Sequence, residues 1–126
     1  MQLGVLWAIA IGGAAGSLAR HYLSSGVYSV TGSSPSGIFA VNVLGGLIMG
    51  IIVELGALKL NYSPELRAFL ITGMLGGFTT FSAFSLDSAL LIERGDWIGA
   101  AVYMIGSVLL SVGALFAGLW LVRSFA

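Results

Sequence analysis

The chain contains no cysteine and few charged residues, and each of these absences narrows what the protein can be. Without cysteine there are neither disulfides nor thiol chemistry. Only 8% of the 126 residues are charged, the formal net charge is zero and no basic cluster is present, which excludes nucleic acid as a partner. Instead, 58% of the residues are hydrophobic and the mean hydropathy is +1.04, a composition typical of membrane proteins.

Four long stretches without charge dominate the sequence, and each is long enough for a spanning helix of about 20 apolar residues. The predicted helices lie near residues 4–24, 36–58, 66–91 and 98–122. A turn rich in Gly, Ser and Pro is expected at 28–37. No basic stretch precedes the first apolar run, so we expect this segment to remain as a helix and not to be cleaved as a signal peptide. The fold class is therefore an all-α integral membrane protein, with residues 1–126 forming a single transmembrane domain.

The basic residues are almost evenly divided between the two sides of the membrane. With four spans, Lys59, Arg67 and Arg123 share one side, while Arg20 and Arg94 share the other. Orientation normally follows an excess of Lys and Arg in the cytoplasmic loops, and three against two is almost no excess. Two interpretations remain open: a weakly determined single orientation, or insertion in both orientations with antiparallel pairing of two copies.

Pairs of glycines recur at four-residue spacing in the first two predicted helices. Gly12 and Gly16 form one pair, and Gly46 and Gly50 form another. Small residues at this spacing allow a second helix to approach closely, which matters in lipid because no hydrophobic drive brings helices together there. We expect these four glycines to take part in dimer packing.

One strongly polar side chain, Asn42, stands in the long apolar run of the second predicted helix. An amide in hydrocarbon is costly unless it is hydrogen-bonded, so this side chain must face protein or water. It either holds helices together or lines a polar pathway, and the sequence leaves both interpretations open.

The segment GMLGGFTTFSAF, residues 73–84, combines features that weaken a helix within a predicted span. Gly76 and Gly77 lower helix propensity, and Thr79 and Thr80 can bond to the local backbone, which together predict a break in the helix. A break exposes backbone carbonyl groups that protein, water or a bound cation must satisfy. The segment is therefore a candidate ion site.

Phenylalanines recur at three-residue steps through this segment. Phe78, Phe81 and Phe84 are predicted to lie along one face of the resumed helix, with Ser82 and Ser85 beside them. Such a stripe is ordinarily core packing. Because phenyl edges carry partial positive charge, rings presented edge-on beside hydroxyl groups could instead coordinate a small anion.

The last predicted helix carries a polar stripe, since Tyr103, Ser107 and Ser111 follow one another at four-residue steps. The stripe either bonds neighbouring helices or forms a hydrogen-bonding track for a dehydrated ion. Arg20 and Asp87 lie near predicted span ends, where an interfacial position and a role in the mouth of a pathway are both open.

No constellation for catalysis is present. The sequence has one histidine and lacks H-E-x-x-H, G-x-S-x-G and P-loop motifs, and its acidic residues form no predicted pair within the membrane. An enzyme is therefore not expected. Polar residues aligned on three helices with few buried charges favour a narrow ion pathway.

Four motifs spread along almost the whole chain are GGAAGSLAR, SGIFAVNVLGG, TGMLGGFTTFSAFS and, before the last helix, ERGDW. In these motifs the chain resembles the Fluc, or CrcB, fluoride channels of bacteria and archaea. The resemblance implies a passive channel that exports cytoplasmic fluoride and protects the cell from its toxicity. It also implies a third helix broken within the membrane, an antiparallel homodimer of dual topology with two pores, and a multi-pass location in the inner (plasma) membrane.

The resemblance further implies roles for individual residues. It places in the fluoride pore Asn42, Phe81, Ser82, Phe84, Tyr103, Ser107 and Ser111. Arg20 matches an arginine of the vestibule. The backbone carbonyls of Gly76 and Thr79 match those that hold a structural sodium ion at the dimer interface.

Two positions depart from the family pattern. Ile38 stands where many relatives have threonine, and Asp87 stands where relatives commonly have glutamate. The alternative function is a small coupled carrier, either a proton/fluoride antiporter or a small multidrug-type exporter. Such exporters usually use a membrane-embedded glutamate, and Glu54, late in the second predicted helix, is the only candidate for it.

Overall fold

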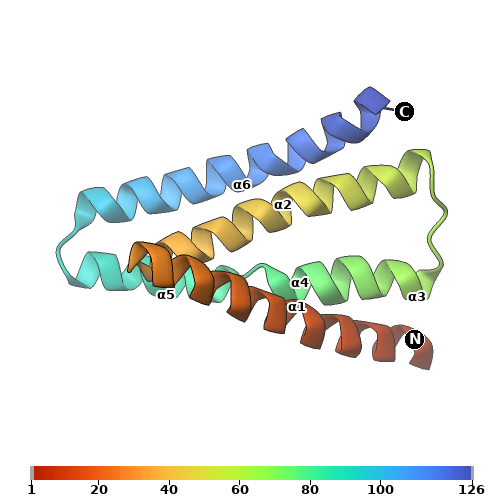
Figure 1. The fold of residues 1–126 in the computed structure, drawn as a ribbon, viewed down its shortest axis with the longest axis horizontal. Coiled ribbons are helices and arrows are strands. Elements are labelled where there is room, and N and C mark those ends of the chain that lie inside the picture. The colour runs from red at the N-terminus through yellow and green to blue at the C-terminus, as the bar shows by residue number, and fades with distance from the viewer. Residues whose placement is uncertain (1, 126) are drawn as a thin grey trace.

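The protein is a bundle of long helices in the computed structural model, which describes residues 2–125 (Figure 1). Its elements in chain order are α1 (Leu3–Thr31), α2 (Ser34–Leu58), α3 (Pro64–Arg67), the π-helix η1 (Ala68–Leu75), α4 (Gly76–Phe78), α5 (Phe81–Glu93) and α6 (Trp97–Phe125). Four helical segments are long and apolar enough to cross a membrane, the third being the combined run from Pro64 to Glu93. The predicted all-α class with four spans is confirmed.

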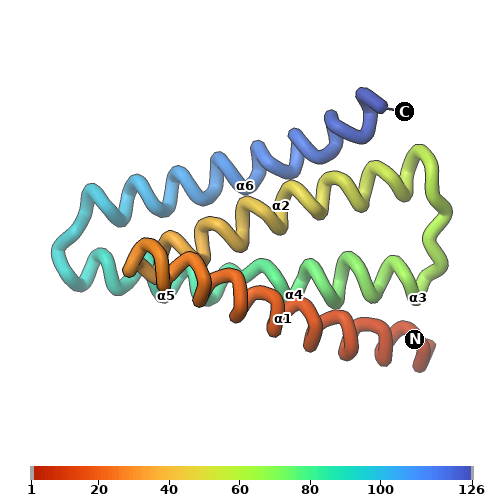
Figure 2. Tube along the Cα trace, in the orientation of Figure 1, coloured from red at the N-terminus to blue at the C-terminus, as the bar shows by residue number. Residues whose placement is uncertain are grey.

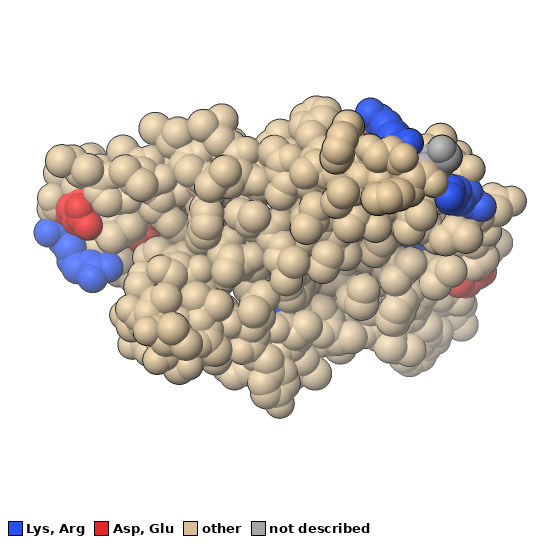
Figure 3. All heavy atoms as spheres, turned by 45° about the horizontal axis from the view of Figure 1, so that its top comes forward, with Lys and Arg blue, Asp and Glu red and all other residues tan. Residues whose placement is uncertain are grey.

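The helices form two closely packed pairs. The most extensive contacts join α2 to α6 and α1 to η1 (Figure 2), and contacts of α1 with α2 and of α5 with α6 hold the two pairs together. Both ends of the chain lie at the same end of the bundle, together with the α2–α3 connection (Figure 1). On the face drawn in Figure 3, charged side chains gather mainly at the two ends, with a broad uncharged band between them. This distribution suits a membrane-spanning bundle.

The first helix is longer than its sequence suggests. We expected it to end near residue 24, with a turn over 28–37, but α1 continues to Thr31 and α2 begins at Ser34. The polar residues at its end remain helical because their hydroxyls bond within the helix, with Ser29 donating to the Gly26 carbonyl at 2.7 Å. Gly32, at φ 69°, then ends α1 in the left-handed conformation that favours glycine.

The glycines of α1 pack against the third span of the same chain. A Cβ atom at Gly12 would lie 2.5 Å from the carbonyl oxygen of Phe69, and one at Gly16 would overlap the carbonyl oxygen of Met74. Only glycine permits η1 to approach α1 this closely.

The glycines of α2 likewise pack against α6. A Cβ at Gly46 would lie 2.6 Å from the carbonyl oxygen of Ser111, and one at Gly50 would overlap that of Leu115. Gly12, Gly16, Gly46 and Gly50 thus all provide close contact within one chain, and their part in dimer packing stays a prediction. Their spacing predicted close approach, but a spacing does not identify the helix that approaches.

The third span is broken within the membrane, as predicted. The break lies at the two threonines rather than at the glycines: Thr79 (φ −84°, ψ 157°) and Thr80 (φ −150°, ψ 124°) are extended, whereas Gly76 and Gly77 remain helical. The hydroxyl oxygen of Thr80 then accepts the Ala83 N–H at 3.1 Å and caps α5. The π-helix before the break was not predicted.

Candidate ion pathway

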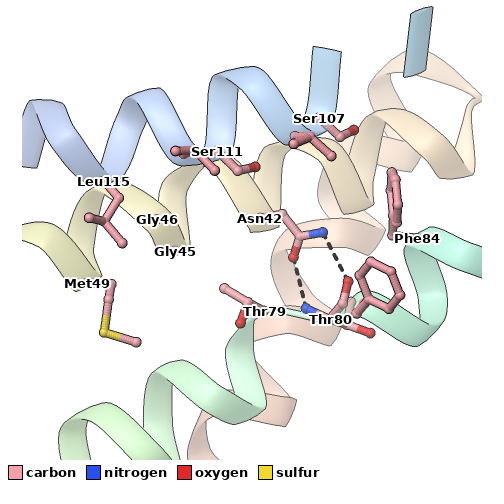
Figure 4. A pocket seen from close by; sticks show the side chains of 13 residues that line it. Asn42, Gly45, Gly46, Met49, Thr79, Thr80, Phe84, Ser107, Ser111 and Leu115 are labelled. Carbon is pink, nitrogen blue, oxygen red and sulfur yellow. Dashed lines mark hydrogen bonds between the residues drawn. The ribbon is translucent and has the colours of Figure 1, made fainter. Parts of the chain in front are cut away.

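A cavity of about 350 Å³ lies between α2, α6 and the break in the third span (Figure 4). Its walls consist of Asn42, Gly45, Gly46, Met49, Thr79, Thr80, Phe81, Phe84, Ser107, Val108, Ser111, Val112 and Leu115. None of these side chains carries a formal charge, and the cavity is open to the outside of the single chain. The space is therefore polar only through hydroxyl, amide and backbone groups.

Both the oxygen and the nitrogen of the Asn42 amide form hydrogen bonds with the backbone of the break (Figure 4). Its Nδ2 donates to the Thr80 carbonyl at 3.0 Å, and its Oδ1 accepts the Thr80 N–H at 2.8 Å. The backbone partners fix the orientation of the amide, because an N–H can only donate and a carbonyl can only accept. One N–H of Nδ2 remains, and Asn42 also lines the cavity.

The Thr80 N–H bonds to Asn42, and carbonyl groups at the break are left without helical donors. In a continuous α-helix the N–H of Thr80 would bond to the carbonyl of Gly76. Within residues 2–125, no hydrogen bond reaches the carbonyl oxygens of residues 76–79. Backbone oxygens at membrane depth need a partner, and a cluster of them is suited to a small hard cation. The residues present thus fit a sodium site.

Hydroxyl groups of α6 form a buried polar row beside the cavity. The buried side-chain oxygens without a hydrogen-bond partner in the described chain are Tyr103 OH, Ser107 Oγ, Ser111 Oγ and Asp87 Oδ2. An unsatisfied buried polar atom costs about 1–3 kcal/mol. Three such atoms at four-residue steps on one helix, two of them from residues that line the cavity, indicate a track for a polar ligand.

Two phenylalanine rings border one end of the cavity. The ring centroids of Phe81 and Phe84 are 5.6 Å apart, and Phe84 also packs on Tyr103 with centroids 5.3 Å apart. Phe84 is 8% exposed, whereas Phe81 is 77% exposed on the single chain. The prediction that Phe78 shares their face is wrong, because Phe78 lies before the break.

The other predicted site residues do not form the wall of the cavity. Tyr103 sits behind Phe84, and Ser82 is exposed with its hydroxyl 3.2 Å from the Thr80 hydroxyl. Gly76 is exposed in α4. Arg20 is half-buried on α1 and takes part in no ion pair within residues 2–125. These residues do not line the cavity of this single chain.

Asp87 lies inside the protein and not at its surface. The residue is 7% exposed, and the Ser34 hydroxyl donates to its Oδ1 at 3.1 Å. Ser34 begins α2, whose N-terminus favours negative charge. The interfacial interpretation of Asp87 is therefore wrong, and the carboxylate joins α5 to the start of α2.

Sequence reasoning missed the contributions of Gly45 and Thr80 to this site. Thr80 was recognised only as part of the break, although its backbone is the partner of Asn42. The signal was present, since a lone amide in an apolar helix requires partners and an exposed backbone supplies them. Gly45 left no comparable signal because the sequence holds many glycines.

Glu54 of α2 forms an ion pair with a residue of α6. Its Oε2 lies 2.6 Å from Nε of Arg123, so α2 and α6 are joined by an ion pair near the end of the bundle where the chain ends. The carboxylate side chain is 9% exposed and the guanidinium side chain 59%. Removing either partner of this pair would leave the other charge uncompensated, which is costly for the buried carboxylate.

Comparison with known proteins gives consistent matches over nearly the full chain. A family model described as "CrcB-like protein, Camphor Resistance (CrcB)" matches residues 7–119. Among similar proteins, the "Fluoride-specific ion channel FluC" of Rhodospirillum centenum is 50% identical over 121 residues, which cover 95% of this chain and 96% of the relative. Proteins of the same name from Rhizobium leguminosarum bv. trifolii and Nitrobacter winogradskyi are 49% and 48% identical over 119 and 124 residues. The first match covers 94% of this chain and 95% of the relative, and the second 98% of each.

Proposed function

Because the chain belongs to the CrcB-like family, we propose that it is a passive, fluoride-selective channel that lets the anion leave the cell. The observation that carries this function is the row of buried, unpartnered hydroxyl groups beside an uncharged cavity in a four-span bundle. The protein is a multi-pass membrane protein, in bacteria of the plasma membrane, and a channel rather than an enzyme.

The chemistry of the cavity suits fluoride. The ion is small and strongly hydrated, so a narrow path must replace its water with compact donors. Ser107 and Ser111 offer hydroxyl groups, and Asn42 offers its remaining amide N–H. The edges of the Phe81 and Phe84 rings add partial positive charge. Without a full positive charge in the wall, the anion is held weakly enough to leave again.

No energy source is needed for export. Fluoride crosses membranes as its neutral acid and is trapped as the anion where the pH is higher. The membrane potential then drives the anion outward through an open path, at about 2.3 kcal/mol per elementary charge per 100 mV. Protection against fluoride toxicity follows from this passive exit.

The carrier alternative lacks support in the arrangement of acids. Its expected coupling residue, Glu54, is paired with Arg123 away from the cavity. A proton-coupled mechanism needs an acid that is alternately exposed along the substrate path, and Glu54 does not line that path.

The proposal includes an antiparallel homodimer of dual topology with two pores. Several observations support it. The cavity is open on the single chain, Phe81 beside it is 77% exposed, and the basic residues are divided three against two between the sides. A second copy would close the open wall and cover the exposed ring.

The proposal also includes a structural sodium ion at the dimer interface. The carbonyl groups of Gly76 and Thr79 would hold it, together with the same groups of a second copy. Support comes from the absence of any hydrogen bond to these oxygens within residues 2–125. Bound there, the ion would supply the positive charge that satisfies the broken backbone.

Reconstituted liposomes test the function directly. Purified protein is placed in liposomes loaded with potassium fluoride, and efflux is followed with a fluoride electrode after valinomycin is added. A channel gives rapid efflux that depends on valinomycin, because the ionophore carries the balancing charge. Phe81→Ile and Asn42→Ala should slow this flux sharply. Proton-coupled efflux without the ionophore would contradict the proposal and favour the carrier.

A further inference from the structure

We propose that Asn42 and the Thr80 hydroxyl are positioning groups that keep the cation site open by diverting the two helical donors that would otherwise close it. The inference rests on the sodium site of the proposed function. It assigns to Asn42 a second task besides lining the anion cavity.

The hydrogen bonds across the break show which carbonyls have been deprived of donors. In a continuous helix, the N–H of residue i bonds to the carbonyl of residue i−4. In such a helix the Thr80 N–H would bond to the Gly76 carbonyl, and the Ala83 N–H would bond to the Thr79 carbonyl. Instead, Oδ1 of Asn42 accepts the first at 2.8 Å and Oγ1 of Thr80 accepts the second at 3.1 Å.

These two diversions coincide with the proposed ligands. Gly76 and Thr79 are the residues whose carbonyls would hold sodium, and each has lost its helical donor to a named side chain. The other two donors across the break, the N–H groups of residues 81 and 82, form no hydrogen bond to the carbonyls of residues 77 and 78. The side chains of Asn42 and Thr80 thus take the donors of the two proposed ligands, whereas the carbonyls of residues 77 and 78 lack donors through the break alone.

The membrane setting explains why Asn42 is required. Without its Oδ1, the Thr80 N–H would be left unsatisfied at membrane depth, where such a group costs several kcal/mol. The nearest acceptor along the chain is the carbonyl of Gly76, so the helix would continue across the break and withdraw that oxygen from the cation. The second bond, from Nδ2 of Asn42 to the Thr80 carbonyl, opposes this movement.

Asn42 consequently links the two ion sites. Its amide holds the backbone of the cation site, and the same residue lines the anion cavity. A cation on the Gly76 carbonyl competes with the return of the Thr80 N–H, and so it stabilises the position of the Asn42 amide. By linkage, ordering of Asn42 favours the cation in return.

Sodium-dependent thermal stability tests the inference without measuring flux. The detergent-solubilised protein is melted across a series of sodium concentrations, with N-methylglucamine replacing sodium to keep ionic strength constant. Asn42→Leu removes both amide bonds at nearly constant volume, and Thr80→Val removes the cap while keeping the N–H. Each should raise the sodium concentration for half-maximal stabilisation at least about tenfold, whereas Thr80→Ser, which keeps the hydroxyl, should preserve it.

A pore variant separates this inference from the proposed channel. Phe84→Ile should slow fluoride efflux and leave the sodium-dependent shift unchanged, because Phe84 makes no bond to the break. If Thr80→Val keeps the wild-type sodium dependence, the inference is overturned even where Asn42→Leu fails to fold. If the wild type conducts fluoride but shows no sodium dependence, the sodium site and this inference fall together while the channel stands.

Discussion

Gly45 of α2 lies so close to Thr79 that a Cβ atom at Gly45 would overlap the Thr79 Cγ2 methyl group and lie 3.3 Å from Cδ2 of Phe78. Thr79 cannot readily turn away, because its hydroxyl donates to the Leu75 carbonyl at 3.0 Å. Thr79, the first residue of the break, therefore packs directly against α2, which is possible because Gly45 has no side chain. One helix thus positions the break twice, with the Asn42 amide and with Gly45.

Gly45→Ala should damage conduction and stability together. The added methyl group must displace Thr79 or move α2, and overpacking of this kind costs about 1–3 kcal/mol. We expect fluoride efflux to fall at least about tenfold and the melting temperature to drop. The matched control is Gly26→Ala, since nothing lies within 4 Å of a Cβ at that position of α1. If the two variants had the same fluoride efflux and the same melting temperature, Gly45 would not be needed to position the break.

The arrangement around the break marks the limit of what the sequence could predict. Apolar stretches between charges located the spans, because spanning helices need continuous apolar length. Gly76, Gly77, Thr79 and Thr80 predicted a broken helix. The bond between Asn42 and Thr80 joins residues 38 positions apart, and periodicity within one helix does not determine which neighbour its polar face meets.

Two further details could not be predicted from the sequence, for similar physical reasons. The spacing of Gly46 and Gly50 predicted close helix approach, but α6 of the same chain and a helix of a second copy would leave the same pattern. The polar end of α1 was expected to be a turn, yet hydroxyls such as that of Thr31, which donates to the Val27 carbonyl at 2.9 Å, satisfy themselves within the helix. Composition alone does not distinguish these cases.

Removing the hydroxyl row should reduce conduction without loss of stability. The Oγ atoms of Ser107 and Ser111 have no hydrogen-bond partner within residues 2–125, so Ser107→Ala combined with Ser111→Ala breaks no such bond. We expect an unchanged or higher melting temperature, because buried unpaired polar atoms are lost. Fluoride efflux should fall at least about tenfold, since the ion loses two donors along its path.

The control for this pair is Ser124→Ala in the same helix. The Ser124 hydroxyl donates to the Trp120 carbonyl at 2.9 Å and is exposed near the end of α6, away from the cavity. Its removal should leave efflux unchanged. A double variant that conducts like wild type would place the fluoride path elsewhere in the bundle.

Ser34 should matter through the buried carboxylate of Asp87. Ser34→Ala removes the hydroxyl that donates to Oδ1 at 3.1 Å, while the other carboxylate oxygen, Oδ2, has no hydrogen-bond partner in the described chain. A loss of about 1–3 kcal/mol in the free energy of unfolding is expected. Combining Ser34→Ala with Asp87→Asn should recover part of it, because a neutral amide is less costly to bury than an unpaired charge. Melting curves of the three variants measure this coupling, and additive losses would contradict it.

The ion pair between Glu54 and Arg123 separates a structural role from proton coupling. Glu54→Gln keeps a hydrogen-bonding group beside the guanidinium and removes the charge, so a channel should conduct fluoride at nearly the wild-type rate. Arg123→Gln instead leaves the buried Glu54 carboxylate without its cation and should lower the free energy of unfolding by about 1–3 kcal/mol.

The Glu54→Gln substitution therefore has different expected outcomes under the two mechanisms. In a coupled carrier it would abolish transport, since the amide cannot bind and release a proton. In a channel it leaves fluoride flux nearly unchanged, whereas Arg123→Gln lowers stability under either mechanism because it leaves the buried carboxylate unpaired. Efflux from liposomes and melting temperature, measured side by side for both variants, decide between these outcomes because only the channel keeps flux when the acid becomes an amide.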